Sequence, residues 1–120
     1  MIDDGKPIFQ QIAEQIENDI ISGALAEESQ VPSTNEFASF HRINPATAGK
    51  GVTLLVDDGI LYKKRGIGMF VAAGARERLL AKRRESFRTD YVLPLITEAK
   101  KLGISPAQLS QLLTDEGEPS

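Results

Sequence analysis

The side chains best suited to chemistry in this 120-residue chain are basic and hydrogen-bonding groups, and they gather in its middle third. Residues 42–88 hold eleven lysines and arginines and four acidic residues, whereas residues 1–36 hold one basic and eight acidic residues. The net charge is −3, but binding to nucleic acid depends on local positive potential against phosphates rather than on the total. By charge alone, the middle third fits a DNA-binding surface and an ordinary solvated helix surface equally well.

The sequence lacks the residues that disulfides, metal sites and common catalytic sites require. The chain has no cysteine and a single histidine, His41, so disulfides and zinc sites rich in cysteine or histidine are excluded. His41 itself is expected at a helix end or in packing. No glycine-rich phosphate loop leads into a helix, and no pair of acidic residues is placed where burial would raise a pKa. The sequence therefore predicts a protein that is not an enzyme and has no cofactor.

No apolar run approaches the roughly 18 residues that a membrane span requires, and the start lacks a signal-peptide pattern. These features predict a cytoplasmic protein with no membrane partner.

Two helix starts are marked by hydrogen-bonding side chains. Ser33-Thr34-Asn35-Glu36 has the pattern of a capping box, in which the Ser33 and Glu36 side chains each bind the other's backbone N–H. The helix that follows is expected to end near His41 and to bury three side chains, Phe37, Ala38 and Phe40. Asn44-Pro45 predicts a second start, with Asn44 as the N-cap and a helix to about Asp58.

Only Arg42 and Ile43 separate these two helices, which leaves room for a tight turn alone and predicts a helix-turn-helix. The N-terminal residues of such a second helix meet base edges in the major groove. With Ala48, Val52 and Leu55 turned inward, the outward positions are Ala46, Thr47, Gly49 and Lys50. Ser33, Thr34 and Asn44 can offer hydroxyl, amide or N–H groups to phosphates.

A change of period after Gly59 predicts a small β-hairpin. Two short strands, Ile60–Arg65 and Met69–Ala73, flank the glycine-rich turn 66–68. The basic run Lys63-Lys64-Arg65 precedes this turn. We expect Arg65 and the backbone of Gly66 to reach a minor groove, with Lys63 and Lys64 supplying charge against phosphates.

Helical periodicity marks the two ends of the chain. A first helix is predicted over residues 7–22, with Gly23 as its stop. A long helix runs from about 75 to 102 and is kinked or split at Pro94. A final helix opens at a second capping box, residues 105–108. The predicted fold is mainly α with a small β-hairpin wing, divided into a winged helix-turn-helix domain (1–73), a two-helix dimerisation segment (74–114) and a disordered tail (115–120).

The long helix carries an apolar stripe that needs a surface to cover it. Its candidate buried positions include Leu79, and a second copy of the chain is the expected cover for five of them: Leu80, Phe87, Tyr91, Leu95 and Leu102. A homodimer would also join two half-sites and so raise the affinity for DNA.

Several motifs in this order resemble the GntR family of bacterial transcriptional regulators. They are Pro7–Ala13, Ile21-Ser22-Gly23, Val31–Ala38, Asp58–Leu61 and Arg65–Val71. The last ~45 residues are similar to the short dimerising tail of the YtrA subfamily. The resemblance implies a transcriptional repressor that binds a palindromic operator as a homodimer. It places Asn35, with Asn44, among the DNA-contacting positions.

Two positions depart from the commoner GntR pattern, which has arginine in place of Asn35 and a Ser/Thr-Arg pair in place of Asn44-Pro45. These departures suggest a different operator, read more through the wing and Lys50. One alternative is a winged-helix module that binds protein and never touches DNA. A small-molecule effector, if there is one, is expected between the tail helices or at the dimer seam. The basic face from Arg76 to Arg88 fits a solvated helix surface or a contact with DNA next to the wing.

Overall fold

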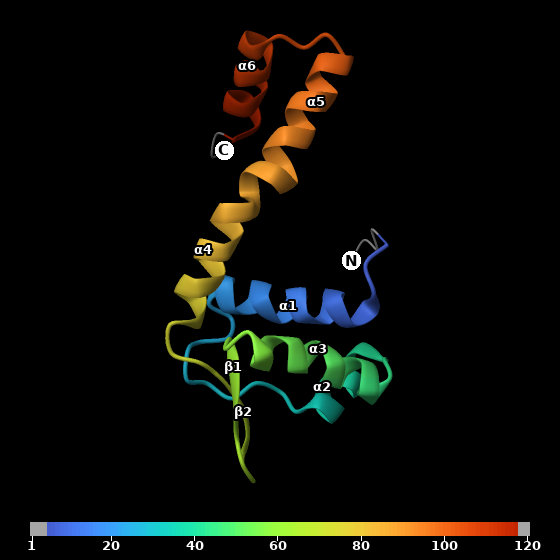
Figure 1. The fold of residues 1–120 in the computed structure, drawn as a ribbon, viewed down its shortest axis with the longest axis vertical. Helices are drawn as coiled ribbons and strands as arrows, with labels where there is room; N and C mark the ends of the chain where they lie inside the picture. The colour runs from blue at the N-terminus through green and yellow to red at the C-terminus, as the bar shows by residue number, and fades with distance from the viewer. Residues whose placement is uncertain (1–4, 118–120) are drawn as a thin grey trace. The chain divides into compact units, whose positions relative to one another are not determined.

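The structure is a computed structural model and describes residues 5–117. Its elements in chain order are α1 (Ile8–Ser22), α2 (Thr34–His41), α3 (Pro45–Asp57), β1 (Leu61–Lys64), β2 (Gly68–Val71), α4 (Ala75–Phe87), a π-helical turn (Arg88–Val92), α5 (Leu93–Lys101) and α6 (Pro106–Gly117) (Figure 1). This agrees with the predicted class, mainly α with a two-stranded antiparallel wing. None of the helices described is long and apolar enough to cross a membrane.

The described residues form two compact units that meet within α4, between Ala81 and Lys82. The sequence placed this boundary at residues 73 and 74. It lies further along the chain because the first turns of α4 belong to the core of the first unit, where Ala75 and Leu79 are almost completely buried. The first unit is therefore longer by two helical turns.

The core of the first unit forms where α1 packs against α3 (Figure 1). Ile12, Ile16 and Ile20 recur at helical spacing and line the inner face of α1. The two helices approach closely at Gly51, where an added Cβ would lie 2.7 Å from the backbone oxygen of Phe9. This crossing fixes the position of α3, the helix expected to read DNA.

The helix-turn-helix forms as predicted, with both caps in place. The Ser33 hydroxyl accepts from the N–H of Glu36 at 3.0 Å, and the Glu36 carboxylate accepts from the N–H of Ser33 at 3.0 Å. Asn44 Oδ1 accepts from the N–H of Ala46 at 2.7 Å. Arg42 ends α2 in the left-handed conformation, with φ 57°.

The prediction that α2 buries Phe40 is wrong, because 83% of this side chain is exposed. On a helix of 3.6 residues per turn, Phe40 lies about 110° from the middle of the face that Phe37 and Ala38 bury. His41 is the last residue of α2 and its ring packs 4.3 Å from that of Phe37. The expectation that His41 is a helix-end and packing residue is confirmed.

The wing pairs Leu61 with Val71 and Lys64 with Gly68, so its strands are slightly shorter than predicted. A segment before α2 extends this hairpin, since the N–H of Val31 donates to Met69 O and the N–H of Val71 donates to Ser29 O. Segments far apart in the sequence therefore share one small sheet, which fixes the wing to the rest of the unit.

The start of α4 is capped by a residue from the loop after α1. The Glu27 carboxylate accepts from the backbone N–H groups of Gly74 (2.9 Å) and Arg76 (3.3 Å). The Arg76 guanidinium in turn donates to Ile21 O at the end of α1. These bonds tie the first turn of α4 to the first unit.

In the second unit, where the sequence predicted a kink or split at Pro94, the α-helical pattern changes to a π-helical turn directly before Leu93-Pro94 and the backbone stays helical. The second capping box is also confirmed, because Ser105 and Gln108 bind each other's backbone N–H groups. The expected disordered tail, 115–120, is not confirmed over residues 115–117, which continue α6. This capped start allows the helix to propagate through Gly117. Residues 118–120 lie outside the described part of the chain.

Candidate nucleic-acid interface

The start of α2 presents backbone donors to solvent. The N–H groups of Thr34 and Asn35 form no hydrogen bond within residues 5–117, whereas Ser33 and Glu36 use theirs in the capping box. Unpaired N–H groups at a helix start attract anions, because they lie at the positive end of the helix dipole. Hydrogen bonds from the Ser33 backbone and side chain lower the pKa of Glu36 from its usual 4.5.

The second turn of α3 lies beside this group, because an alanine Cβ built at Gly49 would lie 3.6 Å from Thr34 Cγ2. Ala46 is exposed and Thr47 is half-buried. Ser33, Thr34 and Asn35 therefore stand at the start of α2, and Asn44, Ala46 and Thr47 stand at the start of α3.

Lys50 lies on the exposed surface of α3, but its ammonium group is not extended into solvent. Its Nζ lies 4.1 Å from the centre of the Phe9 ring on α1, a cation–π contact. A contact with DNA requires Lys50 to leave this ring, and at an exposed site that costs about 0.5–1 kcal/mol. The sequence did not single out Phe9 as a partner of Lys50.

The wing carries the basic residues that the sequence assigned to it. Lys63 and Arg65 are exposed and form no salt bridge within the described chain, while Lys64 Nζ lies 4.4 Å from the centre of the Phe70 ring. Gly66 takes φ 79°, a left-handed conformation that favours glycine in a tight turn. At the base of the hairpin the Tyr62 hydroxyl donates to Glu28 Oε2 at 2.8 Å, which raises the pKa of Tyr62.

Sequence reasoning missed the residue that holds the tip of the wing. Gln30 Nε2 donates to Ile67 O at 3.0 Å, and its side chain fills the space beside Gly68, where an added Cβ would lie 2.5 Å from Nε2. No local pattern marks Gln30, because its partner lies 37 residues further along the chain. Gln30 thus orients the turn between Arg65 and Gly68.

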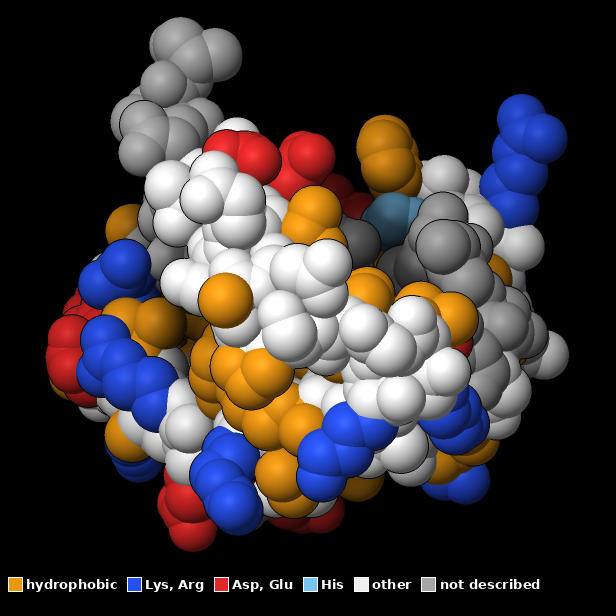
Figure 2. All heavy atoms as spheres, turned by 90° about the horizontal axis from the view of Figure 1, so that it is seen from above, with side chains coloured by type: hydrophobic (Ala, Val, Ile, Leu, Met, Phe, Trp, Pro, Cys, Tyr) orange, Lys and Arg blue, Asp and Glu red, His pale blue; other side chains and the backbone are white. Residues whose placement is uncertain are grey.

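The predicted dimer positions lie in or next to the second unit and are not part of the core. Leu80 is half-buried, while Phe87, Tyr91, Leu95 and Leu102 are 56%, 67%, 40% and 65% exposed. Between residues 82 and 117 only Ala99 is buried. Figure 2 shows exposed hydrophobic side chains grouped next to lysine and arginine side chains. Within the described residues of the single chain, most of these side chains therefore remain open to solvent.

Comparison with known proteins identifies the family. The family model described as "Bacterial regulatory proteins, gntR family" matches residues 8–71, more than half of the chain and the whole of the helix-turn-helix and wing. The chain belongs to the gntR family. The expectation that it is not an enzyme agrees with this membership, since the family consists of regulatory proteins.

Two curated relatives carry the word repressor in their names. The repressor NagR of Bacillus subtilis is 35% identical over 74 residues, which cover 62% of this chain. That match spans only 30% of the length of NagR. The repressor YtrA of the same organism is 25% identical over 109 residues, 91% of this chain and 83% of YtrA.

Solved structures share the gntR fold. A GntR family transcriptional regulator from Listeria monocytogenes superimposes with a TM-score of 0.75 at 25% identity, over 95% of this chain and 98% of that one. The DNA-binding domain of AraR, solved in complex with operator ORX1, matches with a TM-score of 0.56 at 29% identity, over 60% of this chain and 87% of that one.

Proposed function

We propose that this gntR-family protein is a transcriptional repressor that binds a DNA operator through the helix-turn-helix and the wing. The observation that carries the proposal is the start of α2, with unpaired N–H groups at Thr34 and Asn35, packed beside α3 at Gly49. The AraR domain, which was solved on an operator, has the same fold, and this supports the assignment. A cytoplasmic location follows as a further prediction.

The proposed contacts divide into phosphate and base contacts. Ser33, Thr34, Asn35 and Asn44 lie at helix starts, where hydroxyl, amide and N–H groups suit phosphates. Thr47 and Lys50 suit base edges in the major groove, while Ala46 permits close approach. In the wing, Lys63 and Lys64 suit phosphates, and Arg65 with Gly66 suits a minor groove.

We propose that the protein acts as a homodimer. The second unit has almost no interior of its own, and large apolar side chains of α4, α5 and α6 remain exposed. Such a surface is typical of an interface between copies of a chain. The match to YtrA extends over 83% of the length of that repressor, which supports a YtrA-like dimerisation segment. A two-fold dimer would bind a near-palindromic operator with half-sites about 10–10.5 base pairs apart.

The test is a salt titration with the full chain and a DNA fragment selected from genomic DNA. The logarithm of the association constant should fall with log salt by about 0.9 per phosphate engaged. Lys63→Ala should reduce the slope by about 0.9. Arg65→Ala should weaken binding by about 1–3 kcal/mol if it reads bases. Lys101→Ala, at the end of α5, is the control and should leave the slope unchanged.

A flat salt response, or equal effects of Lys63→Ala and Lys101→Ala, would contradict the proposal. Failure to select any DNA fragment would instead favour the alternative, a winged-helix module that binds protein. The exposed wing lysines argue against that alternative, because interface cores are depleted in lysine.

A further inference from the structure

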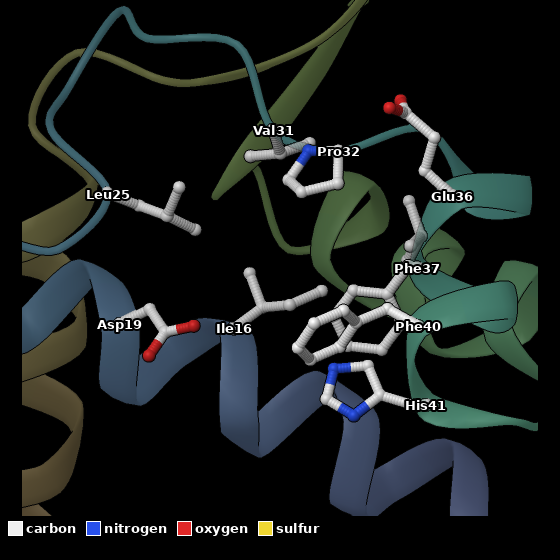
Figure 3. A pocket seen from close by; sticks show the side chains of 10 residues that line it. Ile16, Asp19, Leu25, Val31, Pro32, Glu36, Phe37, Phe40 and His41 are labelled. Carbon is white, nitrogen blue, oxygen red and sulfur yellow. The ribbon is translucent and has the colours of Figure 1, made fainter.

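A cavity of about 460 Å³ opens in the first unit between α1, α2 and the segment that joins them (Figure 3). Ligand pockets for small molecules usually measure roughly 300–1,000 Å³. Ile16 of α1, Leu25 of the joining segment and Phe37 of α2 contribute to apolar walls. All the residues that line this cavity belong to the first unit, whereas the sequence led us to expect an effector between the tail helices or at the dimer seam.

One wall of the cavity is aromatic. Phe37, Phe40 and His41 of α2 present three rings, with centroids 4.3 Å apart between Phe37 and His41 and 5.0 Å apart between Phe40 and His41. Figure 3 shows these rings grouped at one side of the pocket. Phe40 is 83% exposed, so its ring is accessible to a ligand. Aromatic faces attract cations through the quadrupole of the ring.

The charged side chains among the described residues that line the cavity are all negative. Asp19 of α1 and Glu36 of α2 are acidic, and neither lysine nor arginine contributes to the wall. Asp19 Oδ1 accepts from Gln15 Nε2 at 3.2 Å, which leaves its second oxygen available to a ligand. Figure 3 places Asp19 on the α1 side of the pocket and Glu36 on the opposite side, at α2.

We propose that this pocket binds an organic cation that carries an apolar or aromatic group. The apolar group would be buried against Ile16 and Leu25, and the cationic group would lie between the aromatic wall and Asp19. Anions are disfavoured because both charged side chains in the wall are carboxylates. A neutral apolar molecule would use the walls but gain nothing from Asp19.

Binding at this place has a consequence that rests on the proposed function. The cavity walls include Phe37 of α2 and Val52 of α3, and α2 begins at the proposed phosphate contacts. A cation that favours one spacing of α1 and α2 changes the affinity for DNA. DNA then changes the affinity for the cation by the same factor.

The test uses the full chain and three probes of similar size: benzyltrimethylammonium, the neutral benzyl methyl sulfone and the anionic benzylsulfonate. Backbone amide shifts are followed by NMR during titration without DNA. We expect saturable shifts with the ammonium probe, weaker binding of the neutral probe and no binding of the anion, with the shifts confined to α1, α2, residues 24–32 and the surroundings of Val52. This readout needs no operator, so a failure of the DNA-binding proposal would leave it intact.

Three variants locate the site. Phe40→Leu keeps an apolar side chain but removes the ring, and Asp19→Asn removes one charge. Each substitution should lower the affinity for the ammonium probe about fivefold. Asp57→Asn, at the end of α3 and outside the cavity wall, removes the same charge and should change affinity less than twofold. Both cavity side chains are at least partly exposed, so the variants should fold, and the amide spectrum reports this directly.

Equal binding of the three probes would overturn the proposal. So would equal weakening by Asp19→Asn and Asp57→Asn, because the attraction would then be due to net charge alone. For the coupling, the ammonium probe should shift the operator affinity of the wild-type protein and not that of Phe40→Leu. An unchanged operator affinity at saturating probe would refute the coupling while leaving the binding site in place.

Discussion

Gly51 and Gly49 lie two residues apart in α3, and their substitution by alanine separates helix propensity from packing. An alanine in either position raises helix stability by about 0.5–1 kcal/mol relative to glycine. At Gly49 the new methyl group meets Thr34 Cγ2 at 3.6 Å, an ordinary contact. At Gly51 it meets Phe9 O at 2.7 Å and Ile12 Cγ2 at 3.1 Å, so α1 and α3 must move apart.

Overpacking of this kind typically costs about 1–3 kcal/mol. The helix-propensity gain is common to both variants, so the difference in their unfolding free energies isolates this cost. We expect Gly49→Ala to be more stable than wild type by about 0.5–1 kcal/mol. We expect Gly51→Ala to be less stable than Gly49→Ala by about 1–3 kcal/mol.

The assay is urea unfolding at equilibrium, followed by far-ultraviolet circular dichroism without DNA. The chain concentration is held constant, because the measured free energy of unfolding depends on concentration if the chains associate. Overpacking costs at least about 1 kcal/mol. If the unfolding free energies of the two variants differ by less than about 0.5 kcal/mol, the close crossing of α1 and α3 at Gly51 is refuted.

Three further outcomes follow from the fold. Arg42→Gly should raise the thermal midpoint slightly, because glycine takes the left-handed conformation of Arg42 without the cost of about 1–2 kcal/mol that a side chain adds; a lower midpoint would contradict this. The double change of Phe87 and Leu95 to serine should give monomers by light scattering, and a surviving dimer would exclude this face as the interface. The folded-state pKa of Glu36 is lowered, so its stabilising effect should be present above the unfolded pKa and lost as pH falls through the folded value. Wild type and Glu36→Gln should therefore differ in urea midpoint at neutral pH and converge in acid; a difference independent of pH would contradict this reasoning.

The sequence was most informative where structure depends on nearby residues. The capping boxes at Ser33 and Ser105 and the cap at Asn44 were predicted correctly, because each joins residues two or three positions apart. The change to a π-helical turn before Pro94 agrees with the missing N–H group and the ring of that residue. The order of helices and strands, and with it the winged helix-turn-helix, could be predicted in the same way.

Predictions failed where distant segments meet. The domain boundary shifted because Leu79 is buried among residues from other elements. The failure at Phe40 is different, because its exposure follows from its place on α2, about 110° from the middle of the buried face. Glu27 caps α4 from 47 residues away, and Gln30 holds the wing from 37 residues away. No local pattern encodes such pairs.

The same division applies to the candidate site. Residue types and spacing determined which side chains stand at the helix starts and in the wing, since these follow from local caps and periodicity. Only the tertiary structure placed Lys50 over the Phe9 ring and opened a cavity between α1 and α2. The physical reason is that packing between elements depends on shapes and distances that no single segment of sequence contains.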